Sequence, residues 1–346
     1  MKKWQAATRL IMVALAALLT SGGAQSKEGQ PHVKVAVGGA SSLSYLPTML
    51  AATLGAYDEA GVDVEIIDFK GGSVALTSVL GGSADVVSGF YDHCIDIVPK
   101  GKQLVSLVVF DRFLGIVLTV SPTQTAAITS IKDLAGKKVG VSAPGSSTDF
   151  FLKFLLRSNG MDPDKTAVIG VGLDATAVAA MEQGSVDAAS MVDPALTQLQ
   201  ARHKDLRILT DTRTREDTMK AFGGEYPSGS LYAQDSWIKA HPREAQSLAE
   251  AIVRTLKWMK GHSAEEITAK MPPQLVGENR DLYLAALKAT LPMYSETGLM
   301  DQKGSEVVLK VLSQSLPDVA AAHIDLATTY TNEYVSKALA KLGAAP

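Results

Sequence analysis

Short apolar runs alternate with amphipathic segments along the first two thirds of the chain. Val33-Lys34-Val35-Ala36-Val37 alternates apolar and polar residues with the two-residue period of a strand, and a Gly/Ser loop follows it. This pattern predicts strands at 33–37, 64–69, 85–88, 104–110, 115–120 and 138–141, and helices at 46–60, 73–80 and 92–100. Repeated strand–helix–strand units of this length indicate a mostly parallel sheet flanked by helices.

Beyond Gly229 the pattern becomes helical. We expect helices at 242–259, 263–271, 279–291, 304–314 and 325–342. Met271-Pro272-Pro273 separates two of them, because proline cannot continue a helix.

An internal repeat organises the chain. Val64 to Asp85 aligns without a gap with Thr166 to Asp187, and each copy reads strand, turn, short helix and Gly-Ser-x-Asp. Chance similarity between two strand–helix–strand units is the alternative explanation. The repeat predicts two α/β lobes with a ligand cleft between them: residues 31–118 with 227–346 form lobe one, and residues 119–226 form lobe two.

The N-terminus has the layout of a secretory signal. Lys2, Lys3 and Arg9 precede the apolar run 10–19, and small or polar residues follow. The run is shorter than the ~20 residues that span a bilayer. We expect a signal peptide over 1–24, with cleavage after Ala24 or Ser26 as near equivalents. Because the cleavage region has no cysteine, we expect a soluble periplasmic protein that is not lipid-anchored.

Composition excludes some partners. The formal net charge is −3, and removal of the basic signal makes it more negative, whereas nucleic-acid binding needs a basic surface. The single cysteine, Cys94, cannot form an internal disulfide, and a buried, inert thiol is favoured over a reactive one.

Motifs for catalysis are weak. The sequence has no Walker P-loop, no H-E-x-x-H and no cysteine pair for zinc. Gly140-Val141-Ser142-Ala143-Pro144 resembles a nucleophile elbow, but Pro144 replaces its second glycine. Asp92-His93-Cys94 are neighbours in sequence, whereas triads assemble from distant segments. We therefore expect no catalytic residues, no metal and no cofactor.

Loops at the carboxyl ends of the strands are the expected ligand site, because α/β sheets bind ligands there. Most of these loops combine Gly with Ser or Thr and lead into a helix, whose start offers backbone N–H donors; simple N-capping is the alternative for any one loop. We expect the cleft to be lined by Ser41, Ser42, Tyr45, Ser73, Tyr91, Ser146, Ser147, Thr148, Asp174 and Asp193.

Taken together, the motifs resemble a known family. The segments 40–47, 71–73 with 82–85, 131–141 and 184–188, followed by Asp193-Pro194, are similar to signatures of the nitrate/sulfonate/taurine-binding receptors of ABC importers, which include thiamine-pyrimidine binders. The resemblance covers about 33–259. It implies a type II periplasmic-binding fold, closure of the lobes on a ligand and delivery to an inner-membrane permease.

Other readings stay open beside this resemblance. A TRAP-type receptor has nearly the same fold, and a secreted hydrolase is a weaker alternative. Some relatives synthesise the thiamine pyrimidine and carry a run of cysteines that this chain lacks. We expect a monomer that captures a small molecule.

The ligand class follows only partly from the residues. Helix starts rich in Ser and Thr suit a sulfonate or carboxylate, but Asp92, Asp174 and Asp193 would repel an anion unless offset. Arg112 is one candidate to offset them. Tyr45 and Tyr91 suit an organic ligand, and we expect Tyr91→Ala to weaken affinity without unfolding. A small organic anion is the resulting expectation, with a neutral pyrimidine-like ligand as the alternative.

Overall fold

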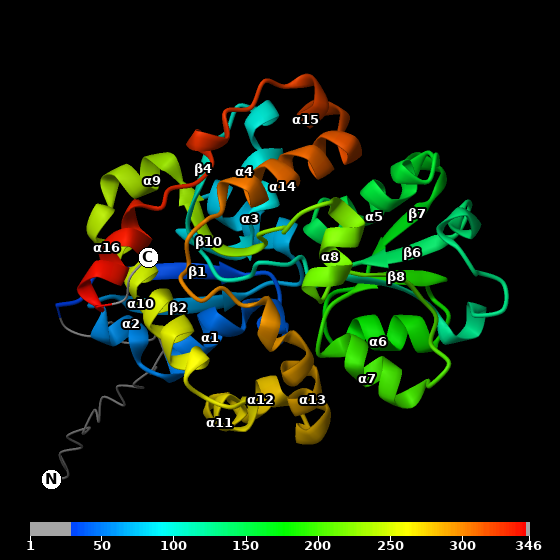
Figure 1. Cartoon of the computed structure of the whole chain (residues 1–346), viewed down its shortest axis with the longest axis horizontal. Helices are drawn as coiled ribbons and strands as arrows, with labels where there is room; N and C mark the ends of the chain where they lie inside the picture. The colour runs from blue at the N-terminus through cyan, green and yellow to red at the C-terminus, as the bar shows by residue number, and fades with distance from the viewer. Residues whose placement is uncertain (1–28, 344–346) are drawn as a thin grey trace, which may run out of the picture.

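Two five-stranded sheets form the framework of the chain in the computed structural model, which describes residues 29–343 (Figure 1). The first sheet has the order β2-β1-β3-β10-β4 and the second β7-β6-β8-β5-β9. The strands of the first sheet are β1 His32–Val37, β2 Asp63–Asp68, β3 Val86–Phe90, β4 Leu104–Val109 and β10 Gly229–Gln234. Those of the second are β5 Val117–Val120, β6 Lys138–Val141, β7 Ala167–Gly170, β8 Ala188–Met191 and β9 Ile208–Asp211.

Helices flank both sheets, as the sequence predicts. Those associated with the first sheet are α1 Leu46–Thr53, α2 Ala56–Glu59, α3 Gly72–Leu80, α4 Asp92–Asp96, α9 Asp235–Ala240, α10 Pro242–Lys260, α11 Ala264–Lys270, α12 Pro273–Val276, α13 Arg280–Thr290, α14 Gln302–Ser315, α15 Pro317–Ala321 and α16 Glu333–Lys341. The second sheet carries α5 Ser147–Ser158, α6 Ala175–Glu182, α7 Ala195–Arg202 and α8 Arg215–Phe222. The two-lobed α/β architecture is confirmed.

Each sheet contains one antiparallel strand, and it is the strand by which the chain crosses between the lobes. β5 pairs antiparallel with β8 and β9, and β10 pairs antiparallel with β3 and β4. The parallel strands end where the lobes face each other, so a strand that starts at this junction must run the opposite way. Val117 and Leu118 already pair within the second sheet, so a lobe boundary after residue 118 would cut β5 in two.

The internal repeat occupies equivalent places in the two sheets. β2 and β7 are the edge strands beside β1 and β6, and β3 and β8 lie on the other side. The aspartate of each Gly-Ser-x-Asp motif makes an equivalent hydrogen bond. The Asp85 carboxylate accepts the N–H of Lys34 at 2.8 Å, and the Asp187 carboxylate accepts the N–H of Lys138 at 2.8 Å. The motif therefore ties the segment before β3 to β1 in lobe one, and the segment before β8 to β6 in lobe two.

Alanine at either aspartate should destabilise the protein by about 1–2 kcal/mol, because each leaves a strand N–H without its charged acceptor. Asp85→Ala and Asp187→Ala should be additive, since the sites lie in different lobes. Urea unfolding measures both. Asp205→Ala, in an exposed loop, is the control; an equal loss there would remove the special role of the motif.

Some predicted helices are interrupted. The segment expected as one helix over 46–60 divides at Gly55, which has φ +73° and begins α2 after α1 has ended. The segment 325–342 contains a short 3₁₀ turn at Leu326–Thr328 before α16 starts. Helical periodicity continues through both breaks, so the pattern alone does not reveal them.

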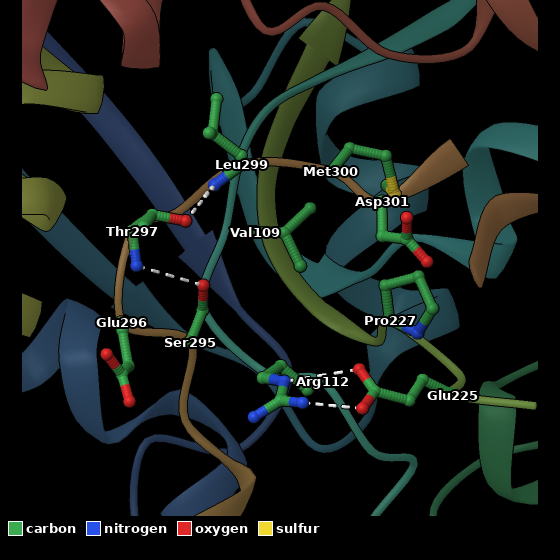
Figure 2. Close-up of a pocket in the computed structure, with 10 residues that line it drawn as sticks. All are labelled: Val109, Arg112, Glu225, Pro227, Ser295, Glu296, Thr297, Leu299, Met300 and Asp301. Carbon is green, nitrogen blue, oxygen red and sulfur yellow. Dashed lines mark hydrogen bonds and ion pairs between the residues drawn. The ribbon is translucent and has the colours of Figure 1, made fainter. Parts of the chain in front are cut away.

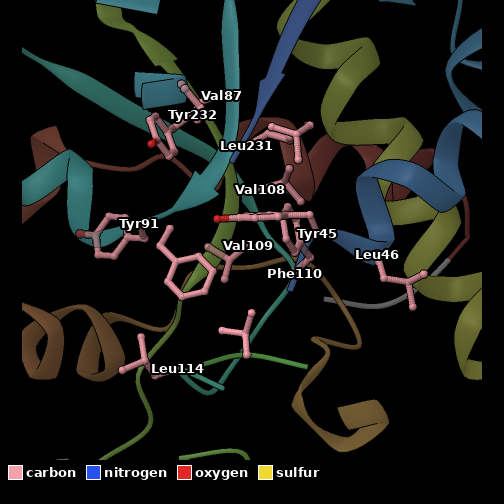
Figure 3. Packing of buried hydrophobic residues seen from close by; sticks show 14 of the residues in the cluster. Tyr45, Leu46, Val87, Tyr91, Val108, Val109, Phe110, Leu114, Leu231 and Tyr232 are labelled. Atoms are coloured by element: carbon pink, nitrogen blue, oxygen red, sulfur yellow. The ribbon is translucent and has the colours of Figure 1, made fainter. Parts of the chain in front are cut away.

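The core runs through both lobes. Tyr45, Phe110, Leu231 and Tyr232 are buried in lobe one, where Figure 3 shows them packed around β10. The same cluster continues into α5 of the second lobe, while a smaller cluster fills the face covered by α6 and α7. α14 lies against both α4 and α5, and Arg157 Nε of α5 donates to the carbonyl of Ser315 at 3.2 Å. The lobes are thus in extensive contact.

Candidate ligand-binding site between the lobes

A small cavity lies where the carboxyl ends of the strands from the two lobes meet. Its lining residues from lobe one are Ser42, Ser44, Tyr45, Gly72 and Phe90, and those from lobe two are Ser142, Ser146, Ser147, Thr148, Leu173 and Val192. Its volume is about 10 Å³, the lower limit for a single water molecule (~10–15 Å³). The two lobes therefore pack closely around this cavity, which has no room for an organic ligand.

The start of α5 forms the polar wall of this cavity. Ser146 is the N-cap in an extended conformation, and Ser147 and Thr148 follow as the first helical residues. The Thr148 hydroxyl accepts the N–H of Ser142 at 2.9 Å, and Asp149 accepts the N–H of Gly145 at 2.8 Å. These bonds hold the loop so that the first turn of α5 faces the cleft. The N–H of Asp149 already donates to the carbonyl of Ser146 at 2.8 Å, so Ser147 and Thr148 are the residues whose N–H groups the helix start can offer to a ligand.

Direct hydrogen bonds join the two lobes around the cavity. The N–H of Ser73 donates to Oγ of Ser146 at 3.0 Å, and Oγ of Ser73 donates to the carbonyl of Pro144 at 3.0 Å. On the other side, the N–H of Leu43 donates to the carbonyl of Asp193 at 2.9 Å. The two lobes are thus joined at the cavity by direct hydrogen bonds of the protein with itself.

A buried carboxylate stands beside the start of α5. Asp92 begins α4 and is fully buried; it accepts the hydroxyl of Ser147 at 2.7 Å and that of Tyr226 at 3.4 Å. Burial raises the pKa of Asp92. The neighbouring His93 bonds the Tyr232 hydroxyl through Nδ1, while its buried Nε2 has no partner among the described residues. Asp92 therefore places a titratable group at the junction of the lobes.

The structure brings together six of the ten residues expected at the site. Ser42, Tyr45, Ser146, Ser147 and Thr148 line the cavity, and Ser73 bonds across the lobes at its edge. Tyr45 lies edge-on to Phe90 with ring centroids 5.9 Å apart, which gives the cavity an aromatic wall.

The other four expected residues do not line the cavity.

Ser41 is partly exposed beside it. Tyr91 is fully buried in lobe one with its hydroxyl on Thr329. Asp174 caps α6 through the N–H of Thr176, and the Asp193 carboxylate binds Thr197 and Arg213. The side chains of Tyr91, Asp174 and Asp193 thus each have a structural partner that the sequence alone does not show.

Several lining residues were not selected from the sequence. They are Ser44, Gly72, Phe90, Ser142, Leu173 and Val192. Gly72, Phe90, Leu173 and Val192 have no polar side-chain atom, so a search for hydroxyls and carboxylates passes over them. Ser44 and Ser142 do carry hydroxyls and were not selected although they lie in the same segments as selected residues. The available signal was position, because these residues lie at or shortly after the carboxyl ends of strands, in a strand end, a loop or the first turn of a helix.

Arg112 lies at the lobe crossing and not in the cleft. Figure 2 shows it beside a surface cavity of about 460 Å³, where its guanidinium pairs with Glu225 of the second crossing segment. Arg215 binds the same carboxylate. Burial acts to raise the pKa of Glu225, but Arg112 and Arg215 together lower it below its ordinary value. Arg112 thus ties the crossing segments together and does not offset a carboxylate of the cavity.

The signal peptide expected over 1–24 lies outside the described residues. Over 29–343, no helix is both long and apolar enough to cross a membrane. The same part of the chain contains no group of three or more His, Cys, Asp or Glu side chains that could hold a metal ion. Cys94 is a buried free cysteine, and burial raises the pKa of its thiol well above the ordinary value.

Comparisons with known proteins agree with this architecture. A family model described as NMT1/THI5 like matches residues 43–266. A structure from Bordetella bronchiseptica RB50 is 38% identical, covers 91% of this chain and 98% of its own, and superposes with a TM-score of 0.87. The alkanesulfonate-binding protein SsuA from Xanthomonas axonopodis pv. citri, bound to MOPS, shares the fold with a TM-score of 0.68 at 15% identity, over 87% of this chain and 99% of that one.

A nitrate/nitrite binding protein, NrtA of Nostoc sp., is 22% identical over 242 residues, which are 64% of this chain and 53% of NrtA. Both SsuA and NrtA are described as binding proteins. The family model alone spans more than half of the sequence and includes the loops around the cavity. The chain therefore belongs to the NMT1/THI5-like family, and the resemblance of its motifs to nitrate- and sulfonate-binding receptors is confirmed.

Proposed function

We propose that this protein is the periplasmic solute-binding component of an ABC-type importer. It captures a small organic anion, such as a sulfonate or carboxylate, by closure of its lobes and delivers it to a membrane permease. Closure is a population shift toward the form that binds the ligand more tightly. The protein acts as a monomer and performs no catalysis.

The observation that carries this proposal is the orientation of α5. Its N-terminus, with Ser146, Ser147 and Thr148, opens into a cavity formed by both lobes. Backbone N–H groups at a helix start favour negative charge, and nearby hydroxyls add donors. Tyr45 and Phe90 provide apolar surface opposite, which suits the organic part of the ligand.

The lobe boundaries follow from the two chain crossings. We place the first crossing just before β5 and the second between α8 and β10, so that lobe two comprises about 117–226 and lobe one the remainder. Arg112 and Glu225 pair where the two crossing segments run together, which makes this pair a marker of the hinge. Closure around this hinge would move α5 against η1, the 3₁₀ turn at Leu43–Tyr45.

A nitrogen-bearing ligand of the pyrimidine type is the second candidate. Asp92 favours it, because its carboxylate lies behind Ser147 at the cavity wall and could accept N–H donors from such a ligand once the lobes separate. A thermal-shift screen of sulfonates, carboxylates, nitrate and pyrimidines separates the two classes. Stabilisation by pyrimidines alone would replace the anion proposal, and stabilisation by none of these compounds would refute both ligand classes.

Two substitutions at Ser147 test the helix start directly. Ser147→Ala removes a hydroxyl donor, whereas Ser147→Pro also removes the backbone N–H. Proline suits this first helical position, and the preceding Ser146, at φ −87° and ψ 167°, already has the extended conformation that proline requires. We expect Ser147→Pro to bind the anion about tenfold more weakly than Ser147→Ala, because one N–H···anion bond is worth about 1.5–3 kcal/mol.

Isothermal titration calorimetry gives the two dissociation constants, and circular dichroism with thermal melting checks that α5 is retained. Equal affinities in two folded variants would show that the N-terminus of α5 does not hold the anion.

A further inference from the structure

A buried carboxylate lies directly behind the proposed anion site. Asp92 does not itself line the cavity, but it is hydrogen-bonded to Ser147, which does. Asp92 Oδ1 lies 2.7 Å from the hydroxyl of Ser147, the first helical residue of α5. Among the described residues, no lysine or arginine lines the cavity. Lys153 of α5 pairs with Asp149, and Arg213 pairs with Asp193 and Asp211.

Two negative charges this close cannot both persist out of water. A carboxylate that faces another anion in a closed site binds a proton, as in pairs of catalytic carboxyl groups. The helix dipole provides only about half a positive charge, which can offset part of one anion but not two. Hydroxyl donors from Ser147 and Tyr226 reduce the cost of burying Asp92 without supplying a countercharge.

We propose that Asp92 is the charge-compensating residue of the ligand site, which takes up one proton as the lobes close over an anion. The inference rests on the proposed function. In the open form Ser147 moves away with lobe two, and water reaches the carboxylate, which is then ionised at neutral pH. In the closed form, the proton goes to a carboxylate oxygen of Asp92, and the ligand keeps its charge beside the start of α5.

The groups that face Asp92 agree with this assignment. On its own helix lie His93, Cys94 and Asp96, and Tyr45, Tyr226 and Tyr232 face it from other elements. Burial already raises the pKa of Asp92 in the closed form, although His93 and the Ser147 hydroxyl act in the opposite direction.

His93 is the competing proton acceptor. Its ring lies edge-on to Phe150 of lobe two, at 5.8 Å between centroids, and edge-on to Tyr232. Its one bonded nitrogen, Nδ1, contacts a phenol and no carboxylate. An added proton on this ring would therefore gain no ionic hydrogen bond, whereas a proton on Asp92 removes a charge from the site.

The sign of the pH dependence follows from linkage. Binding requires a proton when the carboxyl is ionised in the open form and protonated in the complex. Between those two pKa values, affinity should fall about tenfold for each unit by which the pH rises. Below the lower pKa, both forms carry the proton and affinity should become independent of pH.

Calorimetry tests the inference with a fixed panel of probes: methanesulfonate, butanesulfonate, benzenesulfonate, benzoate and nitrate. For the tightest probe, titration at one pH in phosphate and in Tris, whose ionisation enthalpies differ, gives the number of protons exchanged. We expect an uptake of about one proton for the wild type between the two pKa values and near zero for Asp92→Asn. The affinity of Asp92→Asn should also be nearly independent of pH.

Asp96→Asn is the matched control. This variant removes the same charge from the same helix, but Asp96 pairs with Lys100, whereas Asp92 bonds the cavity residue Ser147. It should retain the proton uptake. Asp92→Ser, which is neutral and smaller, provides a second test if the Asn variant melts at a much lower temperature than the wild type.

Other outcomes would overturn the inference. Loss of uptake in His93→Gln with retention in Asp92→Asn would assign the proton to His93. Binding without proton uptake in the wild type would show that Asp92 keeps its charge or pairs with a donor on the ligand. Failure of every probe to bind either protein would instead refute the proposed anion receptor itself.

Discussion

Alanine at Gly71 should weaken ligand binding by about tenfold to a hundredfold, because it blocks closure of the lobes. Gly71 precedes α3 in lobe one, and a Cβ atom at this position would lie 2.9 Å from Cβ of Ala143 in lobe two. Such a contact exists only when the lobes are closed. An added methyl group would therefore destabilise the closed form and leave the open form in place.

Backbone strain accompanies this steric effect. Gly71 has φ +141° and ψ 153°, a conformation that is essentially confined to glycine, and alanine there costs about 1–3 kcal/mol. Gly82→Ala is the control for strain, since Gly82 also has a positive φ, of +77°, but has open space around its Cβ position. The control should lower stability without a comparable loss of affinity.

A reciprocal substitution separates the two effects further. Ala143→Gly removes the atom with which the new methyl group collides. The double variant Gly71→Ala/Ala143→Gly should regain much of the affinity while the strain at residue 71 remains. Calorimetry gives the affinities, and small-angle X-ray scattering reports whether ligand still closes the lobes. If the double variant does not regain ligand affinity, the loss of affinity in Gly71→Ala is due to backbone strain alone.

Alanine at Tyr91 should lower the free energy of unfolding by about 3–5 kcal/mol, as expected for removal of a large aromatic ring from a core. The ring is fully buried among the apolar side chains of lobe one (Figure 3). It lies edge-on to Tyr330, at 6.2 Å between centroids. The Thr329 hydroxyl donates to the carbonyl of Leu326, so the Tyr91 hydroxyl donates to Thr329 Oγ1. We therefore expect Tyr91 to act as a core residue and not as the ligand contact that the sequence suggested.

Tyr91→Phe keeps the ring and loses only the hydroxyl. It should cost about 1 kcal/mol of stability, the usual net value of one hydrogen bond, and leave ligand affinity unchanged. Urea unfolding and calorimetry measure the two quantities. A Tyr91→Phe variant of normal stability but much weaker binding would return Tyr91 to the ligand site.

The sequence predicted the repeating parts of this protein well. Strand periods, helix starts and the Gly-Ser-x-Asp motif depend on interactions within a few residues or on one face of an element, so they leave a pattern in the chain. The aspartates of the repeat, Asp85 and Asp187, proved to make the same bond in the two lobes. Local patterns were less reliable at Gly55, where one residue with a positive φ divides a helix whose apolar period continues.

The candidate site was predicted in outline for the same reason. Strand ends rich in Gly, Ser and Thr identify the loops, and the start of α5 at Ser146 and Ser147 lines the cavity. Within those loops, residue type did not show which way a side chain points. Asp174 and Asp193 look like ligand contacts in sequence, but their carboxylates cap α6 and bind Arg213.

The sequence by itself determined the fold class, the two-lobed plan and the family, because these depend on periodicity, a repeat and local motifs spread over the chain. Only the tertiary structure decided which residues of the two lobes contact each other across the cleft. The pairing of Asp92 with Ser147 and the approach of Gly71 to Ala143 each join residues more than fifty positions apart and in different lobes. Such contacts are set by how the lobes close on each other, and no local pattern records that geometry.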